Sequence, residues 1–286
     1  MKKLVFIAFL ALGTSAFAQN NKITFTKGQK LEIVTEIQKS SAQEVMGQSM
    51  ESTMNATITQ SLDVEDVNET GATIEQKIKR ILLNAEGMGQ SQSFDSEKED
   101  DRKGEMGKLM EKSLKNKYTM VIDGAGKLVS VKVDDDNPNA NKEDDMSEMM
   151  SMQMGFDLGV PKAGDRSEFA ILPDKKIAKG DTWTDQENKE GIKRTTNYTV
   201  NNITDTEVVL DFTEEVSVDK TQAVMGMDAT ISTKDKSTGK IIIDKKSGLF
   251  KQKNSTTSTE GTVDVQGMSI PITGKTNLTV TMKPAS

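Results

Sequence analysis

The sequence predicts a mainly β protein, in which an internal duplication forms a large curved antiparallel sheet or two half-barrels, with two short helices as a lid. Three observations support this fold class. Apolar and polar residues alternate through much of the chain, which is the pattern of half-buried strands. A strand–turn–strand phrase occurs twice. Hydrophobic residues make up 34% of the chain and aromatic residues 4%, which favours a curved sheet that is wet on one face over a conventional large core.

The repeated phrase occupies residues 120–129 and 241–250. In each copy, three apolar strand formers precede an aspartate, and a leucine follows that aspartate five residues later. An Asp/Gly turn between two strands is a hairpin signal. The turn residues are Asp123 and Gly126 in the first copy and Asp244 and Gly248 in the second. A second similarity also indicates two copies of one unit. A Lys-Gly pair followed by a polar residue precedes a predicted strand in each half, as Lys27-Gly28-Gln29 and as Lys179-Gly180-Asp181.

The first 18 residues have the features of an export signal. Lys2 and Lys3 precede an apolar stretch, Leu4 to Leu12, and Ala16-Phe17-Ala18 offers a cleavage site. The apolar stretch is shorter than the roughly 20 residues that a spanning helix needs. We therefore expect a mature chain that starts at Gln19, is exported to the periplasm or the cell exterior, and does not span a membrane. The signal looks bacterial.

Charge and cysteine content narrow the classes of partner. Removing residues 1–18, which carry two lysines and no acid, takes the net charge from -7 to -9. Nucleic acids and anionic membrane surfaces need clustered Lys and Arg, so neither is expected as a partner. There is no cysteine, so neither a disulfide nor a lipid anchor through Cys can form.

The elements follow from periodicity and turn residues. Met106, Leu109, Met110 and Leu114 lie on one helical face and predict a helix over 102–116. Strands are expected in the first half at 22–39, 52–67, 72–83, 90–95, 117–123 and 127–133. In the second half they are expected at 166–171, 182–188, 192–204, 206–219, 222–234, 239–245, 248–259, 261–266 and 273–282. Turns are expected at Asp219-Lys220, Ser237-Thr238-Gly239 and Gly274-Lys275-Thr276.

These elements divide the chain into four parts. Residues 1–18 are the signal peptide, and 19–133 form the first β-rich unit. Residues 134–165 hold an acidic linker and a methionine-rich helix over 143–156. Residues 166–286 form the second β-rich unit. Because the helices and the linker have no counterpart in the second unit, we expect function in the stretch from 102 to 157.

The chain contains no histidine, which removes the usual catalytic base and the commonest zinc ligand. We assign no catalytic residue, no metal site and no cofactor, and expect a protein that is not an enzyme.

Methionines are the unusual feature: there are 17, and five of them fall between 146 and 154. One interpretation is a helix that packs on the sheet. Another is an adaptable apolar surface for a ligand, because methionine is flexible and polarisable. A third is Cu(I) binding through the thioethers of Met149, Met150 and Met152.

The Gly180-Asp181-Thr182-Trp183 motif, the two Asp-turn hairpins and the export signal together resemble a family of secreted β-rich domains of unknown function from Gram-negative bacteria. The resemblance covers roughly residues 22–283 and implies no activity. Gly180, Asp181 and Trp183 are expected to be structural, with Trp183 as a core anchor. The architecture also looks like the periplasmic lipoprotein-carrier fold, an unclosed barrel with helices over its concave face.

These observations favour a binding module whose ligand is a lipid or another apolar molecule. The cavity would lie under the helices and would be lined by Met106, Leu109, Met110, Met149, Met150 and Met154. The alternatives are a structural or interaction protein of the envelope, with an envelope protein as partner, and a Cu(I)-binding protein.

Overall fold

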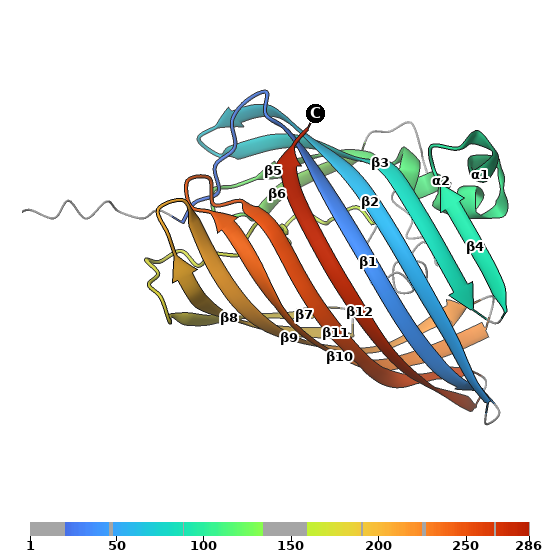
Figure 1. The fold of residues 1–286 in the computed structure, drawn as a ribbon. Helices are drawn as coiled ribbons and strands as arrows, with labels where there is room; N and C mark the ends of the chain where they lie inside the picture. Colours follow the sequence, from blue (N-terminus) through green and yellow to red (C-terminus); the bar gives the residue numbers. More distant parts are fainter. Residues whose placement is uncertain are drawn as a thin grey trace, which may run out of the picture.

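The computed structural model describes residues 21–45, 48–87, 89–133, 159–189, 191–224, 227–265 and 267–285. Its strands form one large antiparallel sheet that curves strongly without closing into a barrel (Figure 1), so the predicted fold class is confirmed. The strands of the first half are β1 Lys30–Val45, β2 Gln48–Asn68, β3 Gly71–Gly87, β4 Gln90–Asp95, β5 Lys117–Ile122 and β6 Leu128–Val133. Those of the second half are β7 Thr182–Lys189, β8 Ile192–Ile203, β9 Glu207–Val224, β10 Met227–Asp244, β11 Phe250–Val265 and β12 Met268–Pro284.

The two ends of the described chain meet in the middle of this sheet. Strand β1 pairs with β2 on one side and with β12 on the other. The order across the sheet is β6-β5-β3-β2-β1-β12-β11-β10-β9-β8-β7, and β4 pairs with β3. Each half of the chain is thus one wing of the sheet, with β6 and β7 at the two outer edges.

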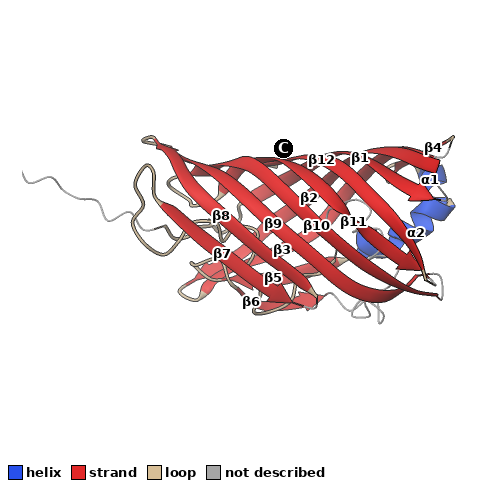
Figure 2. Ribbon diagram, turned by 90° about the horizontal axis from the view of Figure 1, so that it is seen from below, coloured by secondary structure: helices blue, strands red, loops and turns tan. Residues whose placement is uncertain are grey.

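The sheet is a long trough with two different ends (Figure 2). We call the end that holds the start of β1 and the end of β12 the turn end, and the end that holds the β1–β2, β9–β10 and β11–β12 connections the tip end. The strands alternate in burial, so one face of the sheet is the inner face and the other the outer face. At the turn end the inner faces of both wings share one core, which includes Ile33 of β1, Met120 of β5 and Leu210 of β9. We call this cluster the turn-end core.

Both Asp turns lie at the turn end and are built alike. In the first, the Asp123 carboxylate accepts hydrogen bonds from the backbone N–H of Ala125 and Lys127, both at 2.9 Å. In the second, the Asp244 carboxylate accepts from the backbone N–H of Ser247 at 2.8 Å. Gly126 and Gly248 have φ of 84° and 71°, which an L-residue rarely adopts. The predicted hairpins are therefore confirmed as β5–β6 and β10–β11.

The N-terminal segment joins the two turns. The N–H of Ile23 donates to the carbonyl of Gly124 in the first turn at 2.9 Å, and the N–H of Thr24 donates to the carbonyl of Ser247 in the second at 2.8 Å. The prediction that the first strand starts at residue 22 is therefore wrong. The backbone groups of residues 23 and 24 bond to the two turns and not to a neighbouring strand. The strand begins at Lys30.

The Lys-Gly turns repeat down to individual hydrogen bonds. The N–H of Gly28 donates to the carbonyl of Val64, and the N–H of Val64 donates to the carbonyl of Gln29. In the second unit, Gly180 donates to Val200 and Val200 donates to Asp181 in the same pattern. In each turn a side chain, Gln29 or Asp181, accepts from the backbone N–H three residues earlier.

Three predicted turns are wrong, because each lies inside a long strand. Asp219-Lys220 is within β9, Ser237-Thr238-Gly239 within β10, and Gly274-Lys275-Thr276 within β12. The strand predicted at 222–234 spans the end of β9 and the start of β10, and β10 continues through the strand predicted at 239–245. The strands predicted at 248–259 and 261–266 are one strand, β11. Gly239 is in a strand for a packing reason: a Cβ there would come within 2.5 Å of the Phe212 ring.

The strand predicted at 166–171 is also not formed. Residues 164–172 cross between the two wings at the turn end, and we call them the strap. A single bridge joins Arg166 to Lys127, and the N–H of Ser167 donates to the carbonyl of Gly126. Two ion pairs join the strap to β7 of the other wing: Arg166 with Asp185 at 2.6 Å, and Asp165 with Lys189 at 3.0 Å.

Candidate functional site

The methionine-bearing helix in the described part of the chain is α2, Glu105–Lys115, which follows the short helix α1, Glu99–Lys103. Met110 is 1% exposed and packs with Ile37, Ile58 and Phe94 in a second core cluster, against which Met106 also packs. Leu109 is 39% exposed, so it faces away from that cluster. The structure thus brings two of the six predicted lining residues together.

The other methionine predictions fall outside the described residues. These are Met149, Met150 and Met154 as cavity lining, Met152 as a Cu(I) ligand with Met149 and Met150, and the helix over 143–156. They stay predictions. A gap of about 10 Å³ lies near α2, lined by Gln60, Gln76, Ser113 and Tyr118 among others, which is room for about one water molecule.

A polar band crosses the inner face on the tip side of the turn-end core. It follows one row of paired strands through Thr196, Glu214, Ser237, Thr257, Thr276 and Lys39. The Thr196 hydroxyl donates to Glu214 at 2.9 Å, and Arg194 in the next row lies 3.7 Å from Glu214 and 3.2 Å from Glu187. Within this band, one oxygen of Asp235 is buried without a hydrogen-bond partner among the described residues.

An aromatic stack borders this band. Trp183 stacks on Tyr198 with ring centroids 5.2 Å apart, and Tyr198 lies against Phe212 at 6.4 Å. The stack packs against the turn-end core, which is where a core anchor would be expected. The indole N–H of Trp183 is buried and has no acceptor among the described residues.

Glu168 of the strap interacts electrostatically with Lys253, whose ammonium group lies beside the Phe212 ring of the aromatic stack. Its side chain is exposed, yet the surrounding protein is dense enough that desolvation raises its pKa to about 7, while the positive charge of Lys253 opposes that change. Burial also lowers the pKa of Lys253, whose ammonium lies 5.1 Å from the centre of the Phe212 ring. The strap therefore carries a solvent-exposed carboxyl group whose pKa is raised towards neutral pH.

Glu168 predicts a pH dependence of stability. Because its pKa in the folded state lies above the unfolded value of about 4.5, the folded protein binds the extra proton between those two pH values. The free energy of unfolding should therefore fall as pH rises from about 4.5 through 7. We expect Glu168→Gln to remove this part of the pH dependence and to be more stable than wild type at pH 8, as measured by urea denaturation. Because the side chain is exposed, water reduces the size of the effect. Unchanged curves at all pH values would contradict the assignment.

Beyond the polar band, the inner face becomes apolar again towards the tip end. The side chains concerned are half-buried, lie on five adjacent strands and belong to neither core cluster. They are Ile192 of β8, Val216 and Val218 of β9, Ile231 of β10, Val263 and Val265 of β11, and Ile270 and Ile272 of β12. We call them the distal patch. Direct pairing sets Ile231 beside Val263, and Val263 beside Ile270.

Sequence reasoning missed the distal patch for a specific reason. Turns assigned at Asp219-Lys220 and Ser237-Thr238-Gly239 broke β9 and β10 into short pieces, so the inward positions could not be followed along them. The signal was present in the alternation of Val216 and Val218 with polar neighbours, and it continues the inward positions of Leu210 and Phe212.

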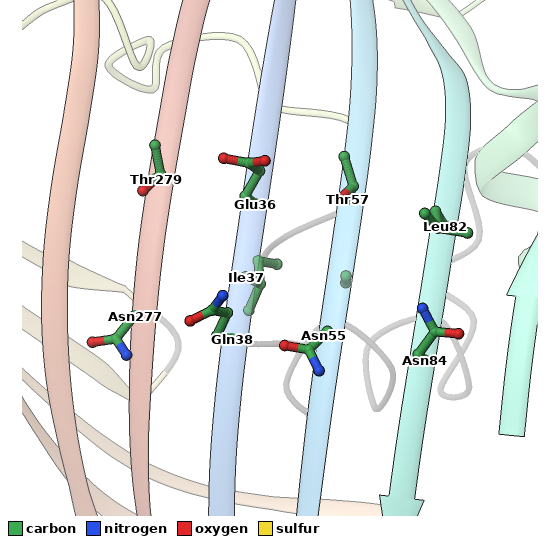
Figure 3. A pocket seen from close by; sticks show the side chains of 10 residues that line it. Glu36, Ile37, Gln38, Asn55, Thr57, Leu82, Asn84, Asn277 and Thr279 are labelled. Carbon is green, nitrogen blue, oxygen red and sulfur yellow. The ribbon is translucent and has the colours of Figure 1, made fainter. Parts of the chain in front are cut away.

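The outer face has a depression over β12, β1, β2 and β3 (Figure 3). It measures about 250 Å³ and is open to solvent. Polar side chains line most of it: Glu36, Gln38, Asn55, Thr57, Asn84, Asn277 and Thr279, together with Leu82. Ile37 and Ala56 also border it but point to the inner face, as Figure 3 shows for Ile37.

The described part of the chain has no group of three or more acidic side chains positioned to hold a metal ion. None of its helices is long and apolar enough to cross a membrane.

These observations define a class: an open, strongly curved antiparallel sheet whose concave face, among the described residues, has a core towards the turn end, a polar band beside it, and an apolar patch outside both core clusters. The chain belongs to the family of unknown function DUF6263, whose model matches residues 69–250. The expected membership of a β-rich family of unknown function is thereby confirmed. Two finer points stay predictions: that the Gly-Asp-Thr-Trp motif marks the family, and that the protein comes from a Gram-negative bacterium.

Two solved structures match this chain, and one of them shares its fold. A structure of lipovitellin and its lipid–protein interactions matches with a TM-score of 0.52 and 10% sequence identity over 92% of this chain. The chain spans about a quarter of that protein, 26% of its length, so the similarity concerns the fold alone. The COG4313 outer membrane channel from Pseudomonas putida F1 matches at 8% identity with a TM-score of 0.25, over 92% of this chain and 98% of that one. No curated protein matches the sequence.

Proposed function

We propose that this protein is an exported, non-enzymatic carrier that binds a lipid or similar amphiphile on the concave face of its sheet. The distal patch is the observation that carries the proposal. Its eight apolar side chains line the inner face of five strands, yet the two core clusters bury none of them. Among the described residues, no core cluster covers these apolar groups of the concave face, and an apolar surface of this kind is suited to an apolar ligand.

The neighbouring polar band suits the other end of an amphiphile. Arg194, Glu214 and Thr196 lie on the inner face directly beside Val216 and Val218 of the distal patch. An acyl chain on the patch would therefore place its head group among charges and hydroxyls. Full burial of a Val or Ile side chain contributes about 1.5–3 kcal/mol, so covering eight half-buried ones would supply a large part of the free energy that offsets the cost of association.

The comparison supports this proposal at the level of fold. Lipovitellin shares the curved-sheet architecture over most of this chain and interacts with lipid. The export signal at residues 1–18 adds a place, the periplasm or the cell exterior, where a carrier for insoluble molecules is of use. The envelope-scaffold alternative and the Cu(I) alternative have no comparable observation among the described residues.

A pair of adjacent substitutions tests the proposal. Val263 faces inward in the distal patch, and Thr262 faces outward one residue earlier on the same strand. We expect Val263→Glu to raise the dissociation constant for a fluorescent fatty acid at least tenfold, because the carboxylate would have to be desolvated under the acyl chain. Thr262→Glu, which adds the same charge to the outer face, should bind like wild type.

Circular dichroism would show whether both variants keep their β structure. Equal affinity of the two folded variants, or no binding by the wild-type protein, would contradict the proposal.

A further inference from the structure

We propose that the outer face of the sheet binds a neutral glycan in the depression over β12, β1, β2 and β3. The observation is a set of carboxamides. Gln38, Asn55 and Asn84 lie side by side on three adjacent strands, because Gln38 pairs with Asn55 and Asn55 pairs with Asn84. All three are exposed, and Figure 3 shows their amide groups projecting from the outer face.

These amides are available to a ligand. Among the described residues, none hydrogen-bonds to the side chains of Gln38, Asn55 or Asn84. Other groups of the same row bond to each other: Thr256 donates to Asn277, which also lines the depression, at 2.9 Å, and Thr184 donates to Asn197 at 2.7 Å. Among the described residues, three of the four amides that line the depression are thus without a hydrogen-bond partner.

The amides belong to a longer row of uncharged polar side chains that crosses ten strands at one level. From one edge of the sheet to the other the row is Thr184, Asn197, Thr213, Thr238, Thr256, Asn277, Gln38, Asn55, Asn84 and Ser93. Neighbouring strands are about 4.8 Å apart, so the row extends for about 40 Å. A row of this length fits an extended chain of repeating units better than a single small molecule.

The chemistry of the lining selects a neutral, hydroxyl-rich ligand. Amides and hydroxyls can both donate and accept hydrogen bonds, as the hydroxyls of a sugar do. Glu36 is the one charged side chain of the lining, and no lysine or arginine lines it, which disfavours phosphate and nucleic acid. Leu82 and the methyl groups of Thr57 and Thr279 can contact the C–H groups of a sugar ring. A lipid chain would find too little apolar surface there.

Side-chain amide signals in NMR spectra report on this site directly. The probes are cellohexaose, maltohexaose and chitohexaose, added in turn to the ¹⁵N-labelled mature protein. We expect at least one of them to shift the side-chain NH₂ signals of Gln38, Asn55 and Asn84. The double variant Gln38→Leu/Asn55→Leu should bind that sugar at least tenfold more weakly, because a hydrogen bond contributes about 1 kcal/mol and several would be lost.

The control is Thr262→Val, which alters the outer face six residues further along β11 than the row and should bind like wild type. Backbone spectra of each variant would show that it is folded. No shift with any of the three sugars would overturn the proposal, as would unchanged affinity in the folded double variant. The inner-face variant Val263→Glu should bind the sugar normally, so this test is independent of lipid binding.

Discussion

Replacing Phe169 with alanine should lower the free energy of unfolding by about 3–5 kcal/mol, the usual cost of removing a fully buried aromatic side chain. Phe169 is 2% exposed. Its ring meets Phe25 edge-on, with centroids 5.7 Å apart and planes at 88°, and stacks on Phe250 at 6.1 Å. The side chain thus holds the strap, the N-terminal segment and β11 together at the turn end. Urea denaturation followed by circular dichroism would measure the effect.

The control for Phe169→Ala is Val129→Ala. Val129 is 53% exposed on the first strand after the Asp123 turn, so its truncation should change stability by less than about 0.5 kcal/mol. A loss below 1 kcal/mol for Phe169→Ala would mean that the strap does not join the wings of the sheet, contrary to the structure.

Gly126→Ala should destabilise the protein by about 2–4 kcal/mol. Its φ of 84° costs an L-residue roughly 1–2 kcal/mol. A Cβ at this position would also lie 2.5 Å from the Cβ of Ala170 and 2.7 Å from the Cδ1 of Ile23, and such overpacking typically costs about 1–3 kcal/mol. The new methyl group would therefore push apart the strap and the N-terminal segment, where the first Asp turn contacts both. The melting temperature and the urea midpoint should both fall.

Gly124, two residues earlier in the same turn, provides the matched control. Its φ is not in the left-handed region, and a Cβ there would meet only the Lys22 side chain at 3.6 Å or more, an ordinary contact. Gly124→Ala should therefore be close to neutral. Equal destabilisation by the two substitutions would show that loss of glycine alone, and not the close approach at Gly126, matters in this turn.

The sequence was sufficient for the fold class because strand periodicity and turn chemistry are local. The short strand predicted at 90–95 is observed as Gln90–Asp95, and both Asp turns form as hairpins. Where the prediction failed, pairing between strands overrode local preference. Gly239, for example, looked like a turn residue, but the Phe212 ring of the neighbouring strand occupies the place of its missing side chain.

The candidate sites were harder to predict because each depends on register. Met106 and Met110 could be placed on one helical face from their spacing alone, and the structure confirms that both contact the same core. The distal patch required knowing that Ile231, Val263 and Ile270 are cross-strand neighbours, although they are far apart in the chain. The row of carboxamides likewise joins residues from both ends of the sequence through the pairing of β1 with β12.

Native mass spectrometry of the mature protein, purified without detergent from the cell envelope, tests lipid binding most directly. The proposal predicts that wild type carries an amphiphile of lipid mass at up to one equivalent, that organic extraction releases it, and that the extracted protein takes up added fatty acid. Val263→Glu should be recovered free of ligand, and Thr262→Glu should retain it. A folded wild-type protein that carries no lipid and takes up none after incubation with fatty acid would contradict the proposal.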